Sequence, residues 1–591
     1  MPIRFNRYQL FTIFGLFWLG LELLGLLLAT IGIFYIGIIV AYIVLASGFF
    51  IYILFRNIPI LSLSKNLKFY LIAIVSFLFI LLFAHYSVPT IFSGRDQGSL
   101  SEAAIRLAEN HKLTFSSPAS EEFFHIYGPG QALNFPGFDY TKDGQLTTQF
   151  PLGYAVWLAI FYSLFGLNGL IIANGITLFI FLLSFFLIAG LYLKTSSSVW
   201  VWLLALTSFS FMWFFKFTLS ENLALAMIWF GLWEFLIFLR NEEPLYLFAS
   251  LLSFIALAFT RIEAWAILPM VFIALYLKYR SWKTIREKMT KKLFLIPLIL
   301  VIILFIISLE VNFSFYRTFA KGFLSAFSPP KNEVDIPSYS LTFATYLVRV
   351  LGLYTILNFL VLAFMGIIFF LKNKKYELLT IAFISLPVLI YLINPSISSD
   401  HPWMLRRFVF VVLPMAILYS VLFLDKFFSR KIFTSIILFL LLVMNLIVFI
   451  PYISRADNEN LLSETQSLSH NFTNADLVLV DRDASGSGWS MVTGPMSFLY
   501  GKQAVYFFNP SDLAKIDTKK FSSVYLIVPD TNFDYYVGSG MLSKFSLVKD
   551  YKIETSSLDI KTGKKNDIYS QPVEFPQEQK TIVYGKIFKL N

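Results

Sequence analysis

LKFYLIAIVSFLFILLFAHYSV, residues 67–88, carries a single lysine among almost wholly apolar side chains. A helix rises about 1.5 Å per residue, so this stretch is long enough to cross the roughly 30 Å hydrocarbon core of a bilayer. A second such run covers residues 432–450, and others recur along the chain. The sequence therefore predicts a polytopic α-helical membrane protein with about 11–13 transmembrane helices.

The composition supports this class. Of the 591 residues, 57% are hydrophobic and 14% are charged, whereas about 25% are charged in an average soluble domain. The net charge is +11, but the basic residues lie mostly in short loops between apolar runs, where they orient a membrane protein, so we expect no nucleic-acid partner. The chain has no cysteine, which excludes disulfides, cysteine-based zinc sites and thiol catalysis. The sequence assigns no cofactor and leaves a metal requirement open.

The basic loops predict which ends of the helices face the cytoplasm. The segment KYRSWKTIREKMTKK (278–292) contains seven basic residues and one acidic residue, and LKNKK (371–375) and DKFFSRK (425–431) are basic as well. With these three segments inside, residues 89–150 and everything after Pro451 lie outside. We therefore expect the functional groups on the extracytoplasmic face.

The stretch 151–193 must cross the membrane an odd number of times if residues 89–150 are outside and the three basic segments are inside. It contains two apolar segments interrupted at Gly166–Gly169, and a broken or re-entrant helix would satisfy the requirement. Lys194 and Arg240 are then expected at the cytoplasmic end.

The chain divides into three predicted parts. Residues 1–66 form a two-helix N-terminal membrane extension, and residues 67–451 hold the remaining spans together with the exterior loop 89–150. Residues 452–591 are richer in charge and are predicted to form a soluble α/β domain of ordinary size outside the membrane.

Short apolar runs separated by turn-rich pieces are the basis for this last domain. DLVLVD (476–481), AVYFF (504–508) and SVYLIV (523–528) have the composition of strands. DRDASGSGWS (481–490) is rich in glycine and serine but lacks the spacing of a nucleotide-binding motif, so we interpret it as a plain loop.

FSGRDQGSLSEAAIRLAENHKL (92–113) places charged residues at the start of an amphipathic pattern. Apolar residues recur at helical spacing from Leu100, which predicts a helix along the exterior membrane surface. Asp96 stands where an N-cap residue is expected, and capping alone would explain it. A helix N-terminus and the neighbouring Arg95 also favour a charged carboxylate. A carboxylate at the membrane boundary could serve as general base for an acceptor hydroxyl or amine.

Three further charged residues lie within or beside apolar runs. Glu221 opens SENLALAMIWFGLWEFLIFL (220–239), and Arg261 and Glu263 interrupt FTRIEAW (259–265). Charges at membrane depth are costly and are usually paired or functional. The simpler interpretation is one or two buried ion pairs that fix helix packing, and the alternative is a polar cavity with a direct role.

DHPWMLRRF (400–408) places Arg406 and Arg407 together on the predicted exterior face. The pair could anchor the chain at the interface, with Trp403 as an aromatic belt residue. The positive-inside rule disfavours a basic pair outside, however, so an anionic partner is expected, and guanidinium groups bind phosphate bidentately. A lipid phosphate is the natural candidate. A loop histidine such as His401 is more often merely solvated.

Several segments occur in an order that resembles the GT-C superfamily of membrane glycosyltransferases, in its protein-mannosyltransferase and aminoarabinose-transferase-like branch. They are the aspartate-bearing exterior loop, QFPLGYAVWLAIFYSLFG (149–166), LSENLALAMIWFGLWEFLIFLR (219–240), TRIEAWAILP (260–269) and HPWMLRRFVFVVLP (401–414). The resemblance covers roughly residues 67–450, and the two spans before it look like an extension.

The resemblance implies an inverting transfer of a sugar from a polyprenyl-phosphate-linked donor to a polar acceptor (protein, lipid or glycan) on the extracytoplasmic face of a cell-envelope membrane. By position it implies Asp96 as the catalytic base. It also implies Arg406 and Arg407, and less directly Arg261, as ligands of the donor phosphate. Gln97 stands where many members have a second acid, which weakens the case for a two-carboxylate or metal-bridging mechanism. The candidates for supporting roles are Arg95, Gln97, Glu221, Glu263 and His401.

Two other functional classes also accommodate intramembrane charges. A lipid or sugar transporter (flippase) should show internal inverted repeats and paired broken helices, whereas this sequence has one broken stretch and no repeat. A non-catalytic scaffold that presents the C-terminal domain leaves the Arg–Asp cluster and the arginine pair unexplained. Within the enzyme class, oligosaccharyltransferases are disfavoured because the tail lacks a WWDYG-like signature.

Overall fold

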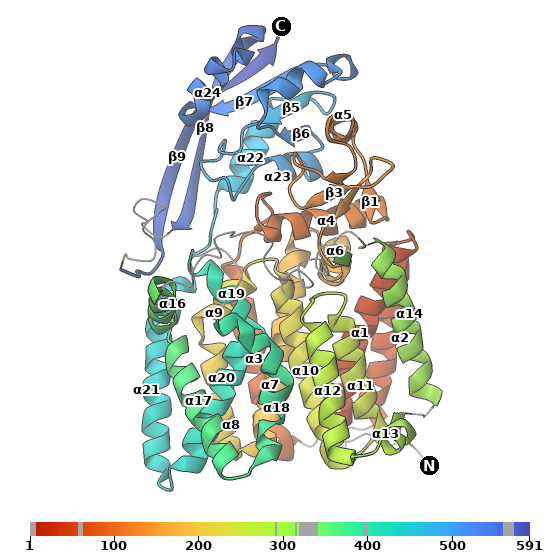
Figure 1. The fold of residues 1–591 in the computed structure, drawn as a ribbon, viewed down its shortest axis with the longest axis vertical. Coiled ribbons are helices and arrows are strands. Elements are labelled where there is room, and N and C mark those ends of the chain that lie inside the picture. The colour runs from red at the N-terminus through yellow and green to blue at the C-terminus, as the bar shows by residue number, and fades with distance from the viewer. Residues whose placement is uncertain are drawn as a thin grey trace, which may run out of the picture.

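The computed structural model describes residues 7–56, 63–289, 292–311, 313, 316–317, 341–393, 400–559 and 572–591. A bundle of helices carries a mixed α/β cap on one of its ends (Figure 1). The order of the spans also predicts exterior loops at 312–347 and 394–407; most of the first and the start of the second lie outside the described residues. The prediction of a polytopic helical membrane protein with a β-containing C-terminal part is confirmed.

Apolar helices build the bundle, because backbone polar groups must find partners within the chain where lipid replaces water. In chain order the bundle helices are α1 (Arg7–Thr30), α2 (Ile36–Arg56), α3 (Leu63–His85), α6 (Leu152–Phe165), α7 (Leu167–Tyr192), α8 (Thr195–Leu206), α9 (Phe209–Phe215), α10 (Ser220–Asn241), α11 (Pro244–Leu257), α12 (Ala264–Tyr279), α14 (Lys292–Val311), α16 (Leu341–Leu353), α17 (Ile356–Lys372), α18 (Thr380–Ser385), α20 (Val412–Phe427) and α21 (Lys431–Phe449).

Six of the described helices are long and apolar enough to cross a membrane, namely α1, α2, α3, α7, α10 and α21. Three bent pairs raise this number to nine if each is one span: α8 with α9, α16 with α17, and residues 403–409 with α20. The predicted total of about 11–13 also counts shorter apolar helices such as α11 and α12, and it stays a prediction.

The stretch 151–193 folds as two helices with different positions. α6 ends at Gly166, whose φ of 59° suits glycine, and α7 begins beside it. A Cβ at Gly169 would lie 2.0 Å from Phe161 O, so glycine allows α7 to start against the α6 backbone. α6 lies under the cap next to α4 (Asp96–Asn110), and α7 runs through the bundle (Figure 1). Of the two, only α7 is long enough to cross a membrane, which agrees with the odd number of crossings expected from the basic loops.

The basic segment and the cap lie at opposite ends of the bundle. α13 (Trp282–Met289), within the segment 278–292, lies far from the cap and near the N-terminal end of the chain (Figure 1). Arg240, near the end of α10, donates to Leu191 O of α7 at 2.7 Å, so these two helices end at the same level. The basic segment thus lies at the end of the bundle away from the cap, as the predicted orientation requires, and the side of the membrane that each end faces stays a prediction.

The cap combines two sheets from distant parts of the chain. Residues of the exterior loop form β1 (Thr114–Phe115), β2 (Gly130–Gln131), β3 (Phe138–Tyr140) and β4 (Leu146–Thr148), which pair antiparallel in the order β1-β4-β3-β2. C-terminal residues form β5 (Leu477–Val480), β6 (Gln503–Tyr506), β7 (Val524–Pro529), β8 (Phe545–Asp559) and β9 (Gln577–Leu590). Their order is β6-β5-β7-β9-β8; β5 pairs in parallel with β6 and β7, and β9 pairs antiparallel with β7 and β8.

The predicted strand runs DLVLVD, AVYFF and SVYLIV correspond to β5, β6 and β7. β5 is buried along all four of its residues, as expected for a strand covered on both faces. The helices of the cap are α4, α5 (Pro118–Tyr127), α22 (Leu461–Ser469), α23 (Thr493–Phe498) and α24 (Phe533–Gly538).

One hydrophobic core joins the exterior loop to the C-terminal residues. Phe123 of α5 and Leu146 of β4 are 0% exposed and belong to the same cluster as Leu479 of β5 and Leu526 of β7. A segment of about 60 residues has a small core and is only marginally stable alone, and here the loop shares its core with the C-terminal sheet. This corrects the expected place of α4: it is enclosed between α6 and the cap rather than lying on a lipid surface, and even Glu102 on it is buried.

α1 packs inside the bundle, although the sequence suggested an N-terminal extension. Thr12 Oγ1 donates to the Glu234 carboxyl of α10 at 3.0 Å, and α1 approaches the Phe230 ring at Gly15. α2, by contrast, lies at the edge of the bundle, because only Ile39 and Ile53 of its side chains are buried. α1 shares its core with helices beyond residue 66. The division of the chain at residues 66 and 451 therefore stays a proposal.

Candidate functional site

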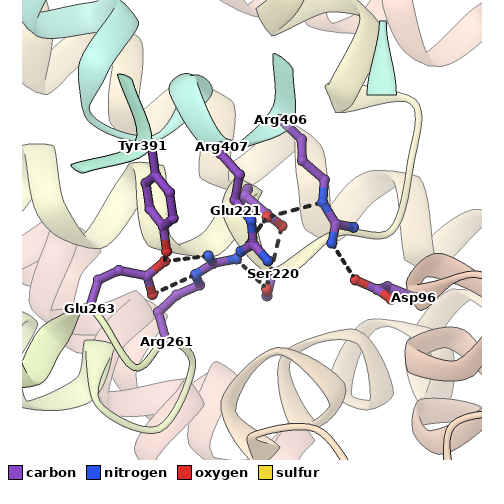
Figure 2. A network of polar contacts seen from close by, with 8 residues as sticks. All are labelled: Asp96, Ser220, Glu221, Arg261, Glu263, Tyr391, Arg406 and Arg407. Carbon is purple, nitrogen blue, oxygen red and sulfur yellow. Dashed lines mark hydrogen bonds and ion pairs between the residues drawn. The ribbon is translucent and has the colours of Figure 1, made fainter. Parts of the chain in front are cut away.

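Six of the predicted site residues meet where the cap rests on the bundle (Figure 2). Each comes from the start of an element or from a short connection: Asp96 opens α4, Glu221 is the second residue of α10, Arg261 and Glu263 connect α11 to α12, and Arg406 and Arg407 open α19 (Arg406–Val409). Four segments that are far apart in the sequence therefore converge at one level of the structure.

Glu221 holds three guanidinium groups together. Its Oε1 atom lies 2.8 Å from Arg261 Nη1, 3.4 Å from Arg407 Nη1 and 3.7 Å from Arg406 Nε. The Glu221 side chain is 2% exposed, and the three arginines are largely buried as well. Three like charges at this separation repel strongly where water is excluded, so the central carboxylate is what allows the arginines to converge.

Glu263 holds Arg261 from a second side. Arg261 Nε and Nη2 donate to the two carboxylate oxygens of Glu263 at 3.0 and 2.5 Å, a bidentate pair. Arg261 Nη1 donates to Ser220 Oγ at 3.2 Å, and Tyr391 Oη donates to Glu263 Oε1 at 2.5 Å. All three nitrogens of Arg261 are engaged, so the ion-pair interpretation describes Arg261 and Glu263, and Arg261 is the least accessible of the arginines to a phosphate.

Arg406 faces the open side of the network. Its Nη2 donates to Asp96 Oδ2 at 2.6 Å, and the Asp96 side chain is 40% exposed against 7% for Arg406. Arg406 Nε and Nη1 and Arg407 Nε are buried and have no hydrogen-bond acceptor among the described residues. A buried donor without an acceptor costs about 1–3 kcal/mol, so these groups are suited to an anionic ligand.

The structure corrects the expected capping role of Asp96. α4 begins at Asp96, and Arg95 occupies the N-cap position with an extended backbone and without a side-chain capping hydrogen bond. As the first helical residue, Asp96 is still favoured by the helix dipole. Its carboxylate pairs with Arg406.

The start of α4 is fixed by the segment that precedes α10. Thr218 Oγ1 donates to Gln97 O at 2.9 Å and lies 2.8 Å from Ser101 Oγ. A Cβ at Gly98 would lie 1.6 Å from Phe92 O, so only glycine fits here. The Gln97 side chain is buried, and its Oε1 has no hydrogen-bond partner among the described residues. Within this part of the chain Gln97 makes no polar contact with the arginine network.

His401 lies apart from this network. It is 4% exposed, and its Nδ1 lies 3.0 Å from Tyr354 Oη. Burial lowers the pKa of His401 to about 4, although the charge of Asp400 acts in the opposite direction. The expectation of a solvated loop histidine is therefore wrong, and His401 is a neutral core residue.

Arg95 contacts residues beside the site from the cap side. Its Nη2 donates to Asp400 Oδ2 at 2.8 Å, and its guanidinium lies 4.5 Å from the ring centre of Trp403 and 5.1 Å from that of Trp489. Sequence reasoning missed Trp489 and Tyr391, and it gave Asp400 no role. Aromatic residues make up 18% of this chain, so neither Trp489 nor Tyr391 stands out from the background.

The described residues contain no group of three or more His, Asp or Glu side chains arranged to hold a metal ion. Glu221 and Glu263 are instead neutralised by arginines, and Asp96 is paired with Arg406. The arrangement offers an exposed carboxylate that can accept a proton, next to guanidinium groups that can bind an anion.

The sequence matches no protein-family model and no curated protein. Solved structures do match. ArnT from Cupriavidus metallidurans in the apo state has a TM-score of 0.53 and 10% identity over 88% of this chain and 98% of ArnT. The archaeal oligosaccharyltransferase AglB from Archaeoglobus fulgidus, solved with an inhibitory peptide and a dolichol-phosphate, has a TM-score of 0.50 and 10% identity over 83% of this chain and 74% of AglB.

ArnT and AglB both belong to the GT-C superfamily. At 10% identity a likeness of structures establishes the fold and not the activity. The agreement extends over the bundle and the cap, since most of this chain is covered. This chain therefore has the fold of the GT-C superfamily of polytopic membrane glycosyltransferases.

Proposed function

We propose that this chain is a membrane glycosyltransferase that moves a sugar from a polyprenyl-phosphate-linked donor to a polar acceptor on the extracytoplasmic face. The observation that carries the proposal is the pair formed by the exposed Asp96 carboxylate and Arg406, whose Nε and Nη1 find no acceptor among the described residues. A base for the acceptor and a cation for the leaving phosphate stand side by side at the boundary of the bundle. The GT-C fold supports the same activity.

A cavity of about 700 Å³ between helices of the bundle is large enough to hold part of a lipid chain. Residues of α10, α12, α17 and α18 line it, and most of its lining side chains are apolar. Two of them, Leu277 and Leu386, are 59% and 55% exposed, so the cavity opens on the lipid-facing side of the bundle. Leu389 also lines it and stands two positions before Tyr391, which belongs to the arginine network. Arg240, Lys278 and Glu377 also line the cavity, so most of it lies toward the end of the bundle opposite the cap, and its Leu389 end is the part nearest the arginines.

The substrate classes follow from these features. The AglB structure contains a dolichol-phosphate, and a lipid phosphate in this chain would meet Arg406 and Arg407. The acceptor is a hydroxyl or amine of a protein, lipid or glycan, which approaches Asp96 from its exposed side. Inversion requires the acceptor and the leaving phosphate to lie on opposite sides of the transferred sugar.

The transfer proceeds as a single displacement. Asp96 takes the proton of the acceptor, the acceptor atom bonds to the anomeric carbon, and the bond between that carbon and the phosphate oxygen breaks. The polyprenyl phosphate leaves with the electron pair of this bond, and Arg406 and Arg407 stabilise its charge. One displacement at the anomeric carbon inverts its configuration.

Donor binding also prepares the base in this mechanism. In the structure Arg406 is paired with Asp96 at 2.6 Å. A donor phosphate competes with the Asp96 carboxylate for the Arg406 guanidinium. Arg406 Nε and Nη1, which donate no hydrogen bond among the described residues, give the phosphate two further donors. Asp96 is thereby released toward the acceptor when the donor is in place.

A lipid or sugar transporter is the alternative that the structure favours less. Transporters of this size bind their substrates near the bilayer midplane, where broken helices meet. The charged network lies instead at the end of the bundle that carries the cap, and it includes the start of α4 from the cap itself (Figure 2).

The test uses the full chain, purified and reconstituted with a panel of radiolabelled polyprenyl-phosphate sugars and a membrane extract as the source of acceptor. One donor is expected to pass its label to an acceptor with inversion at the anomeric carbon, and Asp96→Asn should bind that donor without transferring its sugar. Movement of labelled lipid across a proteoliposome membrane without any transfer would instead establish the transporter.

A further inference from the structure

The loop 481–491 of the C-terminal part reaches the segment that carries Asp96. Ser93 and Met491 form an antiparallel bridge with two backbone hydrogen bonds, of 3.0 and 2.8 Å. A Cβ at Gly94 would lie 2.9 Å from Gly488 O, and the φ of Gly94 is 107°, so glycine allows this close approach. The loop that the sequence presented as a plain connection therefore contacts the chain two residues before Asp96.

Side chains extend this contact into the arginine network as an alternating stack of guanidinium groups and indole rings. We call it the cation–π stack, and it consists of Arg482, Trp489, Arg95, Trp403 and Arg406. Arg482 and Arg95 each lie 5.1 Å from the ring centre of Trp489. Arg95 and Arg406 lie 4.5 and 5.0 Å from that of Trp403. The last member, Arg406, pairs with Asp96.

The loop is itself held in one conformation. The Asp481 carboxylate accepts hydrogen bonds from Tyr536 Oη at 2.8 Å, Asn532 Nδ2 at 2.9 Å and the backbone nitrogen of Asp483 at 2.8 Å. Arg482 Nε donates to Gly488 O at 3.1 Å and closes the loop. A loop fixed in this way can present Trp489 at a defined place.

Trp489 has no evident structural role other than this stack. It is 50% exposed, whereas a tryptophan that stabilises a core is largely buried. Its ring contacts in the described structure are the two guanidinium groups of Arg95 and Arg482. Removing it should therefore disturb the arginines more than the fold.

We infer that Trp489 and Arg95 are positioning residues for Arg406 and Asp96, and that the loop 481–491 belongs to the transfer site. The inference rests on the proposed function. Arginine side chains have several rotatable bonds, and a transfer site must hold its groups to within roughly 0.5 Å. The cation–π stack limits the positions of Arg406 through the Trp403 ring, in addition to the Glu221 carboxylate, and Arg406 in turn pairs with the Asp96 carboxylate.

The first test compares Trp489→Ala with Trp489→Phe in the full chain. Trp489→Ala is expected to lower kcat roughly 10-fold, with a smaller change in the KM for the donor, because the groups are present but misplaced. Trp489→Phe keeps an aromatic face and should recover most of the loss. Tyr584→Ala removes an aromatic side chain of the same part of the chain that is 57% exposed, and it should leave kcat unchanged.

A second substitution tests whether Trp489 and Arg95 act through one contact. The double variant Arg95→Met with Trp489→Ala should be no slower than the slower single variant. Full kcat in Trp489→Ala, additive losses in the double variant, or a Phe variant as slow as Ala would each overturn the inference. A wild-type chain without any transfer would refute the proposed function instead, so the two failures are distinguishable.

A covalent link distinguishes a fixed positioning loop from a lid that opens. Ser93→Cys and Met491→Cys would face each other in a hydrogen-bonded pair with Cα atoms about 5.5 Å apart, which suits a disulfide, and the chain has no other cysteine. The oxidised variant is expected to keep the kcat of its reduced form. Loss of activity on oxidation that dithiothreitol reverses would show that the loop leaves the site during turnover, which would also overturn the inference.

Discussion

Asp96 is 40% exposed and pairs with Arg406 at 2.6 Å, so it can act as a proton acceptor or serve only as a counter-ion. Asp96→Asn separates these roles, because asparagine keeps the shape but accepts no proton. If Asp96 is the base, turnover should fall by roughly 10²–10⁴, while donor binding persists because Arg406 is freed for the phosphate. Transfer assays and donor-binding measurements check both parts.

The matched control for this variant is Asp143→Asn, which makes the same change at an exposed position of the exterior loop. It should leave turnover unchanged. If Asp96→Asn is as active as the wild type, the carboxylate is only a partner for Arg406, and the assignment of the base is wrong.

Arg406 and Arg407 are expected to bind the donor phosphate, since they hold buried donors without acceptors in the described structure. Replacing either by Ala should weaken donor binding about 10–100-fold, the range for a hydrogen bond to a charged group. Lys should restore only part of the loss, because it lacks the planar fork. Arg430→Ala, at the opposite end of the bundle, is the control. Normal donor binding in both Ala variants would reduce the pair to an interfacial anchor.

At the scale of single residues, charge in an apolar context was the usable signal. Glu221, Arg261 and Glu263 are conspicuous in the sequence because charge within apolar runs is costly, and the structure brings them together. Tyr391 and Trp489 carry no such signal in an aromatic-rich chain. The partner of Arg406 could not be read from the sequence either, because Asp96 lies 310 positions away and is brought near only by the fold.

At the scale of secondary-structure elements, the site is built from the first residues of helices. α4, α10 and α19 each begin with a charged residue of the network within their first two positions. The sequence predicts such breaks well, since an apolar run ends where charge and glycine appear. It does not predict which of these helix ends contact one another. It also predicted α4 on the membrane surface, because an amphipathic stripe has the same pattern whether it packs on lipid or on another helix.

α4 also carries a titratable group that gives the cap a pH dependence. Burial raises the pKa of Glu102 from 4.5 to about 7, and Arg106 opposes this only in part. The unfolded chain therefore loses this proton at lower pH than the folded chain does, so stability falls as pH rises from about 4.5 to 7, by up to about 3 kcal/mol. Glu102→Gln should flatten this decline and raise the melting temperature at pH 8.

Melting curves across this pH range check the prediction for Glu102. Glu121→Gln, at an exposed position of α5, is the matched control and should melt as the wild type does at each pH. A Glu102→Gln variant with the same pH dependence as the wild type would show that the Glu102 carboxyl is not the group responsible.

At the scale of the whole molecule, the cap unites residues that the sequence assigned to separate parts. Leu146 of the exterior loop and Leu479 of the C-terminal sheet lie in one core, and Lys216, which precedes α10, donates to the carbonyl oxygens of Ile453 and Arg455 at 2.7 and 2.6 Å. Long apolar runs reveal the spans, and short apolar runs between turn-rich pieces reveal the strands. A shared core between them depends on contacts across hundreds of residues, for which local patterns give no signal.

The positions of the basic segment and of the cap, at opposite ends of the helical bundle, predict the orientation of the chain in the membrane. The basic segment 278–292 lies at the end opposite the cap (Figure 1), and the positive-inside rule then places the cap outside. The chain has no cysteine, so single cysteines at the exposed positions Lys283, Ser116 and Ser522 report the side without background labelling. An impermeant maleimide added to intact cells should label the cysteines at 116 and 522, whereas the one at 283 should react only after permeabilisation. The opposite pattern would place Asp96 and Arg406 on the cytoplasmic face, where a donor of the same chemistry would have to be presented from the inner leaflet.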